Sequence, residues 1–334
     1  MPLKERLPQL VEVIEGRLQS FLNDLDFGAS AELRTMLRYH LGWEDELAGG
    51  KRLRPVITLL CAEACGGDAA AAMPAALGIE FLHNFTLIHD DIEDQSPTRH
   101  GRATLWTRWG LAQAVNAGDA LFSIAQLALL GLTETCGEAV ALRAVREMNQ
   151  VCLHLTRGQY LDIAFETEDA VDLEAYLAMI GGKTAALIAY STAMGGLAAG
   201  ASKVTLTRLR TLGEALGMAF QIQDDYLGIW GDPAVTGKSA SVDLLARKKT
   251  LPVLFGLRES SEFRALWHVE NPALGQIRAM ADLLEACGAG AYVKALAGKY
   301  IHQAHEGLVG LFPRPNADAR VLMALIGMLL HREL

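Results

Sequence analysis

The sequence predicts an all-α protein, and three observations support that prediction. Apolar residues recur at steps of three and four along most of the 334 residues, which is the period of a helix with one buried face. No segment has the strict alternation of apolar and polar residues that indicates a half-buried strand. Since 51% of the residues are apolar, the chain can bury a sizeable core. With no internal repeat or linker to divide it, the simplest architecture is one large helical bundle over residues 1–334.

The first helix is predicted in LPQLVEVIEGRLQSFL, close to the N-terminus. This stretch is amphipathic and charged and lacks the continuous apolar run of a signal peptide, so we expect none there. The same period predicts further helices at residues 69–94, 111–134, 138–167, 184–200, 205–230, 272–287, 290–312 and 316–332. Turn residues separate them at Gly49-Gly50, Gly66-Gly67-Asp68, Gly181-Gly182, Gly231-Asp232-Pro233 and Pro313-Arg314-Pro315.

Composition narrows the class of protein. The longest uncharged stretch, between Lys183 and Lys203, is about as long as a membrane span. Because it is rich in Ala, Gly, Ser and Thr, we expect a buried bundle helix there and no membrane span. A net charge of −9 without a basic stripe argues against a nucleic-acid partner. Five cysteines without a CxxC pair indicate reduced thiols and a cytoplasmic protein.

Two acidic motifs follow apolar helical runs and carry the functional argument. HDDIED holds Asp90, Asp91 and Asp94, and residues four apart share a helix face. FQIQDDYLGIWGD holds Asp224 and Asp225 after a second run. Either motif alone is compatible with a solvated helix end. Since both end apolar helices, we expect both to face one cavity, where oxygen ligands suit a hard cation such as Mg²⁺ that bridges carboxylates to a phosphate.

Three basic segments supply the opposite charge. GGKRLRP and GGKTAAL each place a lysine after a glycine pair at a predicted helix start, where backbone N–H groups and the helix dipole favour a phosphate. GKSASVDLLARKKTLP adds a third basic segment. The residues singled out in these segments are Lys51, Arg52, Arg54, Lys183, Thr184, Lys238, Lys248 and Lys249. Metal-binding carboxylates and cations together suit a substrate that carries a diphosphate.

The chain resembles the trans-isoprenyl diphosphate synthases, also called polyprenyl synthetases. From about Leu47 to the C-terminus it has the family's motifs in order: GGKRLRP, FLHNFTLIHDDIED, RHGRATLW, AVNAGDAL, GQYLD, GGKTA, FQIQDDYLG and GK…D…KKTLP. A single DDxxD motif is weak evidence, whereas this ordered set is specific. The resemblance implies the isoprenoid synthase fold, an all-α bundle around a deep central cavity, and a homodimer.

The resemblance also implies a reaction, the head-to-tail condensation of isopentenyl diphosphate with an allylic diphosphate (dimethylallyl, geranyl or farnesyl). About three Mg²⁺ ions and basic residues would draw the diphosphate away, and the double bond of isopentenyl diphosphate would attack the allylic carbocation. Such a site must stabilise a leaving diphosphate and a carbocation together. Carbonyl and hydroxyl dipoles would stabilise the cation in a cavity that excludes water.

The family's functional residues carry over position by position. The implied metal ligands are Asp90, Asp94 and Asp224, with Asp91 and Asp225 supporting them. The residues implied to hold the allylic diphosphate are Arg99, Lys183 and Lys248, with Lys238 nearby. Those implied to hold isopentenyl diphosphate are Lys51, Arg54 and His83. Thr184 and Gln221 would place dipoles near the cation, and Gln159 and Asp162 would line the same cavity.

Three positions depart from the family pattern. His100 stands where a second arginine usually helps to hold isopentenyl diphosphate, Gly228 where a third aspartate of the second motif usually stands, and Arg247 where a glycine is usual. A histidine is only partly charged at neutral pH and cannot form a bidentate clamp, whereas Arg247 adds charge that compensates. These changes keep a second class open, a family member that does not elongate, such as a cyclase, a hydrolase or a regulatory subunit. The intact acidic and basic motifs favour the synthase.

Two residues just before the first acidic motif are predicted to set the product length. Phe85 and Thr86 lie about one helical turn before Asp90, where side chains would close the tunnel that receives the growing tail. An aromatic ring at Phe85 obstructs that tunnel, unless it points into the core of the bundle. The resemblance then implies a short-chain enzyme making C20 geranylgeranyl diphosphate, with C15 as the alternative.

Overall fold

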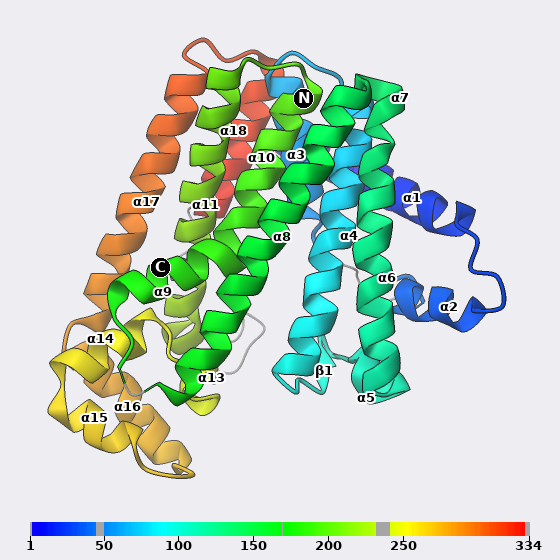
Figure 1. The fold of residues 1–334 in the computed structure, drawn as a ribbon. Helices are drawn as coiled ribbons and strands as arrows, with labels where there is room; N and C mark the ends of the chain where they lie inside the picture. Colours follow the sequence, from blue (N-terminus) through cyan, green and yellow to red (C-terminus); the bar gives the residue numbers. More distant parts are fainter. Residues whose placement is uncertain (1, 45–49, 169, 232–240, 331–334) are drawn as a thin grey trace. The chain divides into compact units, whose positions relative to one another are not determined.

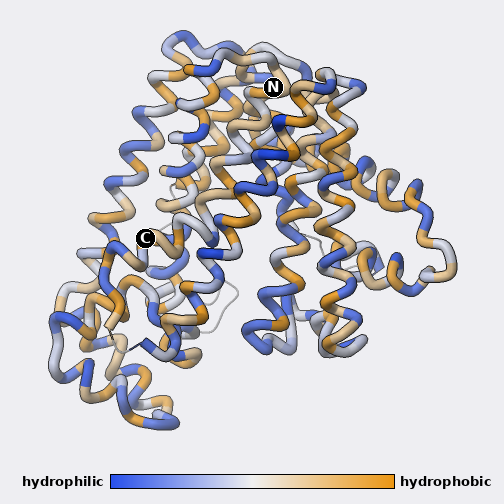
Figure 2. Tube along the Cα trace, in the orientation of Figure 1, coloured by the Kyte–Doolittle hydropathy of each residue, from blue (hydrophilic) through white to orange (hydrophobic). Residues whose placement is uncertain are grey.

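The structure, a computed structural model, describes residues 2–44, 50–168, 170–231 and 241–330, and this part of the chain is almost entirely helical (Figure 1). The all-α prediction is therefore confirmed. The α-helices are α1 (Leu3–Asp24), α2 (Ala31–His40), α3 (Leu53–Ala64), α4 (Ala69–Glu93), α5 (Leu105–Trp109), α6 (Leu111–Leu130), α7 (Leu132–Cys136), α8 (Glu138–Thr167), α9 (Leu173–Ile180), α10 (Ala186–Ala198), α11 (Lys203–Trp230), α13 (Val242–Leu245), α14 (Leu251–Glu259), α15 (Ser261–Trp267), α16 (Leu274–Ala286), α17 (Ala289–Leu311) and α18 (Ala317–Leu330). Figure 2 shows apolar and polar residues mixed along the helices, as expected for helices with one buried face.

The chain's internal contacts group it into two compact units, each described by itself. Unit 1 comprises Met1–Asn149, Ser191–Leu206 and Arg314–Leu322. Unit 2 comprises Gln150–Tyr190, Thr207–Pro313 and Met323–Leu334. The expectation of a single domain over residues 1–334 stays a prediction. The two acidic motifs fall in different units, the first in unit 1 and the second in unit 2.

Unit 1 is organised around α4 and α6, which lie side by side (Figure 1). A glycine on each helix permits the close approach. A Cβ added to Gly78 of α4 would lie 2.7 Å from Leu129 Cγ, and one added to Gly118 of α6 would lie 2.2 Å from His89 Nε2. Both values are too short for real atoms, so larger residues would push the helices apart. This packing fixes the part of α4 that carries the first acidic motif.

Two segments of the described chain are long and apolar enough to cross a membrane, α4 and residues Leu111–Cys136. In α4, 67% of the apolar window is buried inside the protein, and in the second segment 44% is. A core helix of a soluble protein passes the same test, so this is weak evidence. The uncharged stretch between Lys183 and Lys203, which is about as long as a membrane span, contains the largely buried α10. The prediction of a buried helix there is confirmed.

A short hairpin follows α4, although no strand was expected from the sequence. Strand β1 (Thr98–Arg99) pairs antiparallel with β2 (Arg102–Ala103). Its two loop residues, His100 and Gly101, have φ angles of 51° and 76°, the pattern of a type I′ turn. The Tyr39 hydroxyl of α2 donates to the Ala103 carbonyl at 2.9 Å, which braces the hairpin. Strands of two residues are too short to produce an alternating pattern, so they could not be predicted from the sequence.

Unit 2 contains a continuous helical path from α9 through a π-helical turn, η1 (Gly181–Ala185), into the first five residues of α10 (186–190). The predicted turn at Gly181-Gly182 and the predicted helix start at Lys183 are therefore wrong. These glycines serve close packing instead: a Cβ on Gly182 would lie 2.6 Å from the His154 carbonyl oxygen, and one on Gly158 of α8 would lie 2.2 Å from the Lys183 amide nitrogen. The helix-dipole argument does not apply to Lys183, because no helix begins there.

Candidate active site

The first acidic motif is bound by an arginine from the hairpin. Arg99 donates from Nε to Asp91 Oδ1 at 2.7 Å and from Nη2 to Asp90 Oδ2 at 2.9 Å. Asp91 is 2% exposed, and burial raises its pKa to about 6, with Arg99 opposing the rise. Asp94 is exposed at the end of α4, and its N–H donates to the Asp90 carbonyl at 2.9 Å. Asp91 is thus held inside the protein, while Asp90 and Asp94 lie closer to solvent at the same helix end.

Two of the residues predicted to hold isopentenyl diphosphate lie in contact. Arg54 Nη1 is 3.0 Å from His83 Nε2, and the Arg54 Nε is buried without a hydrogen-bond partner among the described residues. Burial lowers the pKa of His83 well below its usual value, and Arg54 adds to the effect. An unpaired buried donor on a cation indicates an anionic ligand or an ordered water. Lys51 lies exposed two residues before α3.

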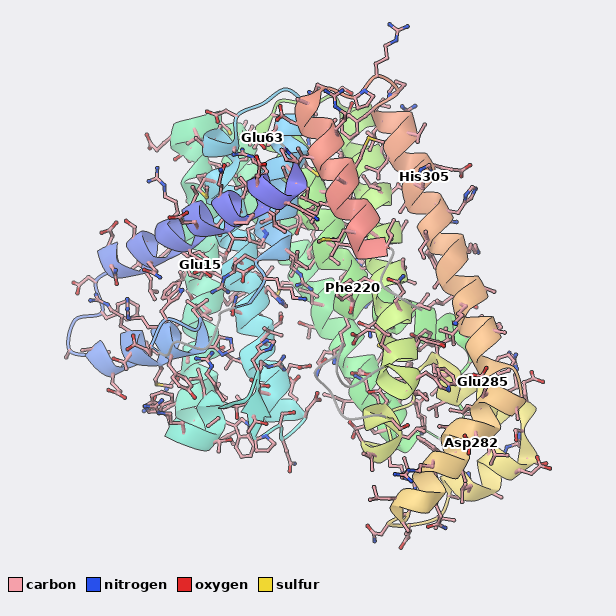
Figure 3. The ribbon with its side chains drawn as sticks, turned by 180° about the vertical axis from the view of Figure 1, so that it is seen from behind. Glu15, Glu63, Phe220, Asp282, Glu285 and His305 are labelled. Carbon is pink, nitrogen blue, oxygen red and sulfur yellow. The ribbon has the colours of Figure 1, made fainter. Side chains whose placement is uncertain are left out.

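Arg52, named among the basic residues of GGKRLRP, has a structural role instead. It is 3% exposed and donates to Glu15 Oε1 at 2.6 Å, Glu80 Oε1 at 2.7 Å and the Leu41 carbonyl at 2.7 Å. Glu15 lies on α1 (Figure 3). Because each of its three nitrogens donates to one of these oxygens inside the protein, Arg52 joins α1, α4 and the end of α2.

His40, at the end of α2, was missed by the sequence analysis. Burial, followed by the charges of Arg99, Arg102 and Arg52, lowers its pKa to about 3, although a hydrogen bond to the Asn84 backbone opposes them. Its Nε2 is buried without a hydrogen-bond partner in the described part of the chain. The ring therefore lies neutral among arginines, beside the stretch of α4 that carries His83. A histidine within an amphipathic helix offers no sequence signal for such a role.

The departure at His100 weakens the predicted diphosphate contact. Burial lowers the pKa of His100, and Arg99 and Arg102 lower it further, so the ring is less charged at neutral pH than a free histidine. Its φ of 51° places it in the left-handed region, which histidine tolerates better than most residues. The side chain is exposed. His100 therefore supplies the hairpin turn but little of the charge of the usual arginine.

Phe85 packs within unit 1 against a second aromatic residue. Its ring centroid is 4.8 Å from that of His89 on α4 and 5.3 Å from that of Phe122 on α6. Phe85 is half-buried, so part of the ring lies outside this packing. The Thr86 hydroxyl donates to the His83 carbonyl of its own helix at 2.7 Å. The role of Phe85 and Thr86 in product length stays a prediction.

The second acidic motif lies in a hydrogen-bond network of unit 2. Asp225 is 3% exposed and accepts from the Tyr176 hydroxyl at 2.5 Å, the Leu251 N–H at 3.0 Å and Gln221 Nε2 at 3.0 Å. Gln221 Oε1 in turn accepts from the Thr184 hydroxyl at 2.8 Å. With three donors on its two oxygens, Asp225 is fixed in place, and its role in supporting the metal ligand Asp224 stays a prediction. The chain of bonds fixes the orientation of Gln221 and Thr184.

Two predicted diphosphate-binding lysines share one carboxylate. Asp162 Oδ2 is 2.6 Å from Lys183 Nζ and 3.7 Å from Lys248 Nζ. Burial raises the pKa of Asp162, but Lys248 and Lys183 outweigh it and lower the pKa below its usual value. Gln159, one turn earlier on α8, has a buried Nε2 without a hydrogen-bond partner among the described residues. Lys238 lies outside the described residues.

Arg247 does not contribute its charge to the candidate site, contrary to the sequence-based expectation. Its guanidinium donates to the Trp267 carbonyl at 2.6 Å and to the Val269 carbonyl, and it lies over the Trp267 ring. It thereby holds the end of α15. Its φ of 56° explains why a glycine is usual at this position, because only glycine adopts that conformation without strain.

The donor chemistry of the acidic motifs fits Mg²⁺. Within the described ranges, no group of three or more His, Cys, Asp or Glu side chains forms a ready-made metal cage. Mg²⁺ needs no such cage, since it keeps several waters and binds one or two carboxylates together with substrate phosphates. Asp90 and Asp224 are half-buried carboxylates of this kind. That the two motifs face one cavity stays a prediction.

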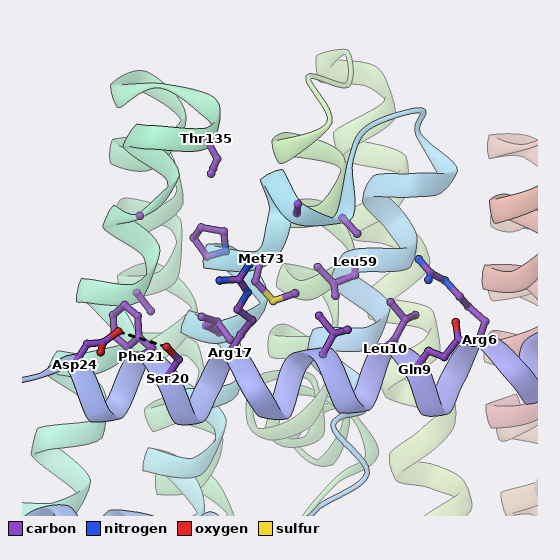
Figure 4. A pocket seen from close by; sticks show the side chains of 17 residues that line it. Arg6, Gln9, Leu10, Arg17, Ser20, Phe21, Asp24, Leu59, Met73 and Thr135 are labelled. Atoms are coloured by element: carbon purple, nitrogen blue, oxygen red, sulfur yellow. Dashed lines mark hydrogen bonds between the residues drawn. The ribbon is translucent and has the colours of Figure 1, made fainter.

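A separate pocket of about 610 Å³ in unit 1 is not part of this site. It lies between α1 and the starts of α4 and α7 (Figure 4), with Leu10, Leu59 and Met73 in its apolar lining. Arg6, at one end, is ion-paired with Glu63. None of the acidic-motif residues lines it.

Comparison with known proteins identifies relatives over most of the chain. The Polyprenyl synthetase family model matches residues 32–283, a range that contains both acidic motifs. A geranylgeranyl diphosphate synthase of Mycobacterium tuberculosis is 43% identical over 277 residues, which cover 81% of this chain and 77% of that protein. A (2E,6E)-farnesyl diphosphate synthase of Mycobacterium bovis is 37% identical over 327 residues, which cover 93% of this chain and 89% of that protein.

Solved structures agree with the sequence relatives. A polyprenyl synthetase from Streptomyces coelicolor A3(2) has a TM-score of 0.88 at 33% identity, covering 98% of this chain and 99% of that chain. A geranylgeranyl pyrophosphate synthetase from Pyrococcus horikoshii Ot3 has a TM-score of 0.87 at 31% identity, covering 99% and 98%. The predicted isoprenoid synthase fold is therefore confirmed.

Proposed function

The chain belongs to the polyprenyl synthetase family, and we propose that it is a trans-prenyltransferase that condenses isopentenyl diphosphate head-to-tail with an allylic diphosphate. Dimethylallyl, geranyl or farnesyl diphosphate is the allylic partner. The observation that carries the proposal is the series of hydrogen bonds from Thr184 through Gln221 to Asp225. Ordered oxygen dipoles and fixed cations are what a carbocation and a leaving diphosphate need.

We propose that the product is short, principally C20 geranylgeranyl diphosphate. Support comes from relatives named geranylgeranyl diphosphate synthase, one of them 43% identical, and from the aromatic ring at Phe85. The farnesyl diphosphate synthases among the relatives keep C15 as the alternative. The half-buried Phe85, braced by Phe122, is bulky enough to limit a growing tail.

The family uses a divalent metal, and we propose Mg²⁺, about three ions as the resemblance implies, held by Asp90, Asp94 and Asp224. When bound, Mg²⁺ supplies positive charge that stabilises the leaving diphosphate. Asp91 and Asp225 position these ligands, because both are buried and hydrogen-bonded, Asp91 to Arg99 and Asp225 to the Tyr176 network. Replacing Asp90 or Asp224 with Asn is expected to lower kcat by about a hundredfold or more.

The chain's basic residues bind and orient the two diphosphates. Arg99, Lys183 and Lys248 hold the allylic diphosphate, with Lys238 near it. Lys51, Arg54 and His83 hold isopentenyl diphosphate, and His100 adds little charge. Ligand phosphate oxygens would satisfy the buried Arg54 Nε, which has no partner in the described part of the chain.

In the reaction, the allylic C–O bond breaks and its electron pair leaves with the diphosphate. The double bond of isopentenyl diphosphate then forms a new C–C bond to the allylic carbon, and a proton is lost to restore a double bond. The Thr184 hydroxyl donates to Gln221, so its lone pairs remain directed away from that bond and can stabilise the cation. Exclusion of water prevents capture of the cation as an alcohol.

We also propose that the protein is a cytoplasmic homodimer. Within unit 1, α6 exposes Leu127 and Leu130, which are 49% and 46% exposed and lie three residues apart on one side of the helix. Within unit 2, α8 exposes Leu153 and Tyr160, at 61% and 71%. Apolar helix faces of this kind are typical of subunit interfaces. Light scattering coupled to size-exclusion chromatography measures the molar mass and hence the oligomeric state. A monomer at micromolar concentration would refute the proposed dimer.

The decisive experiment incubates the purified protein with Mg²⁺, labelled isopentenyl diphosphate and each allylic primer, and then measures product length. A longer prenyl diphosphate supports the proposal. Release of diphosphate without chain growth identifies a cyclase or hydrolase instead. No turnover with any primer indicates a non-catalytic subunit.

A further inference from the structure

One carboxylate of α1 binds both ends of the segment that carries a predicted diphosphate-binding lysine. Glu15 Oε2 accepts a hydrogen bond from Trp43 Nε1 at 2.8 Å, and Glu15 Oε1 accepts one from Arg52 Nε at 2.6 Å. Trp43 precedes residues 45–49, which lie outside the described part of the chain, and Arg52 follows them. The two ends of this segment are therefore held on a single side chain of the N-terminal helix.

Arg52 needs such support because its backbone is strained. Its φ of 48° lies in the left-handed region, where the Cβ of a residue other than glycine crowds the following carbonyl oxygen. Conformations of this kind persist only where the surrounding contacts over-determine them. Here Glu15 binds the Nε of Arg52, while Glu80 and the Leu41 carbonyl bind its other two nitrogens. The left-handed turn at Arg52 thus depends on side-chain contacts, one of which comes from α1.

Arg52 stands between two residues that are predicted to hold isopentenyl diphosphate. Lys51 precedes it, and Arg54 follows it in the first turn of α3 with an Nε that has no hydrogen-bond partner among the described residues. The Val56 N–H donates to the Arg52 carbonyl at 3.1 Å, so α3 begins from this residue. Because a change in the backbone of Arg52 would turn Lys51 relative to Arg54, the contact from α1 affects both predicted ligands together.

The helix that carries Glu15 is firmly seated in unit 1. Its buried residues recur at steps of four and form one stripe: Leu10, Ile14, Leu18 and Leu22. Glu15 adjoins this stripe, and its side chain is 24% exposed, so water only partly screens its ion pair with the buried Arg52. Since the match to the family model begins at residue 32, Glu15 lies outside the family's motifs.

We infer that Glu15 is a positioning residue for isopentenyl diphosphate. By holding Trp43 and Arg52 on one carboxylate, it fixes the two cations that flank Arg52 in the geometry that binds a diphosphate. The inference rests on the proposed function, in which Lys51 and Arg54 bind that substrate. Cations held in place beforehand lose less freedom when the ligand arrives, so affinity depends on the support of their backbone. Glu15 acts through Arg52, because a carboxylate in contact with the diphosphate would repel it.

Substrate affinity tests the inference separately from turnover. Glu15→Gln keeps the shape of the side chain but replaces one acceptor oxygen with an amide NH₂, so one of the two donors then faces another donor. The Kd for isopentenyl diphosphate, measured by calorimetry without Mg²⁺ or an allylic substrate, should rise about tenfold. The KM for isopentenyl diphosphate should rise with it. The kcat and the KM for the allylic diphosphate should stay unchanged, since only binding of one substrate is lost.

Arg6→Gln is the matched control. It breaks another ion pair of α1, the one between Arg6 and Glu63 of α3, and Arg6 lies about 13 Å along the helix from Glu15. This variant should lower the melting temperature but leave the Kd and the KM for isopentenyl diphosphate unchanged. If Arg6→Gln weakened binding as much as Glu15→Gln, the effect would come from a loosened α1, and the inference would be wrong.

A double-mutant cycle makes the test sharper. Trp43→Phe removes the indole donor, so in the double variant Glu15→Gln, Trp43→Phe the amide oxygen can accept from Arg52 while no indole N–H faces the amide NH₂. The double variant should therefore bind isopentenyl diphosphate no more weakly than Glu15→Gln alone. Two independent defects would instead multiply, and that result would contradict the shared role of the carboxylate.

The outcomes separate the inference from the proposed function. If Glu15→Gln binds isopentenyl diphosphate as tightly as the original protein does, the inference is wrong even when the original protein elongates prenyl chains. If the original protein does not elongate, but Glu15→Gln weakens binding and Arg6→Gln does not, the inference stands and the proposed function fails. If the original protein binds no isopentenyl diphosphate, both fail.

Discussion

Tyr176 donates its hydroxyl hydrogen to Asp225, with 2.5 Å between the two oxygens. Both residues are buried, so this bond forms away from water and leaves no unpaired polar atom between them. Burial raises the pKa of Asp225, while the donors Leu251, Tyr176 and Gln221 oppose the rise. Asp225 is therefore the fixed end of the hydrogen-bond series that orients Gln221 and Thr184.

Replacing Tyr176 with Phe is expected to lower the free energy of unfolding by about 1–3 kcal/mol, because a buried carboxylate loses one of its donors. We also expect kcat to fall more than KM changes, since Gln221 loses its fixed anchor. Urea denaturation and steady-state kinetics measure the two effects. Tyr292→Phe is the matched control, a tyrosine of unit 2 packed on Phe255. Equal stability of both variants would contradict the role given to the bond.

Replacing Gly158 with Ala is expected to destabilise unit 2 by about 1–3 kcal/mol, the usual cost of overpacking. The new Cβ would meet the Lys183 amide nitrogen at 2.2 Å, and backbone cannot move aside as a flexible side chain does. The displaced turn would also disturb the Lys183–Asp162 pair, so the KM for the allylic diphosphate should rise. Denaturation and initial-rate kinetics check both statements.

Gly298→Ala provides the matched control for that variant. Gly298 lies in α17 with no atom within 4 Å of the added Cβ, so alanine should stabilise the helix by about 0.5–1 kcal/mol. The two glycine-to-alanine changes are therefore predicted to have opposite signs. The same sign in both would refute the close crossing of α8 and η1.

Stability should depend on pH through His40. Its folded pKa of about 3 lies below the unfolded value near 6.5. Between these values the unfolded chain binds a proton that the folded protein excludes, so stability is present above pH 6.5 and is lost as the pH falls. From pH 7 to 5 this residue should cost about 2 kcal/mol. In urea titrations, the free energy of unfolding of His40→Gln should therefore fall by about 2 kcal/mol less between pH 7 and pH 5 than that of the original protein. His302→Gln, on the exposed face of α17, should show the same pH dependence as the original protein.

Restoring the family's arginine at position 100 should improve binding of isopentenyl diphosphate. Burial and the neighbouring arginines keep His100 largely neutral, so His100→Arg adds a permanent charge and a bidentate donor. We expect KM for isopentenyl diphosphate to fall by about threefold to tenfold, roughly the effect of one charged hydrogen bond. His100→Asn, which keeps the left-handed turn without charge, is the control. No difference between the two variants would remove position 100 from the site.

Shortening the side chain at position 85 should lengthen the product. Phe85→Ala removes the ring that is predicted to obstruct the tail, so chromatography of the dephosphorylated alcohols should show chains longer than C20. Phe122→Leu tests whether lost ring packing alone has that effect, because it leaves Phe85 in place. An unchanged chain length in Phe85→Ala would exclude Phe85 as the floor.

Most helices could be predicted from the sequence because each has a long, regular apolar period. The predictions at 138–167 and 205–230 match α8 and nearly all of α11. Shorter helices such as α2, α9 and α14 were not predicted, since 8 to 10 residues give too few turns to establish a period. Glycine pairs were the main source of error: Gly66-Gly67 does form a turn, whereas Gly181-Gly182 lies inside a helix. A glycine pair in a turn and a glycine pair in a closely packed helix differ only in the segments that pack against them.

The candidate site was predicted by residue type, and the structure adds the distinction between anchors and ligands. Arg52 and Arg54 cannot be told apart by the sequence motif. In the structure Arg52 is paired with Glu15 and Glu80, whereas the Nε of Arg54 has no hydrogen-bond partner among the described residues. Likewise, Asp224 and Asp225 are adjacent in sequence, yet Asp225 is buried and accepts from Tyr176 and Leu251, while Asp224 is half-buried. Such differences depend on contacts between distant segments, which a local pattern does not contain.

The π-helical turn at GGKTA makes the length of this segment as important as its composition. A π turn holds one residue more than the α-helix it interrupts. Deleting a single residue between Ile180 and Ala186 would close the wide turn into unbroken α-helix, so the local geometry that places Lys183 and Thr184 would be lost although α9 and α10 stayed in phase. Thr184 would then turn away from Gln221 although every functional residue type remained in the chain. Alignments of relatives should accordingly show no gap within these five positions.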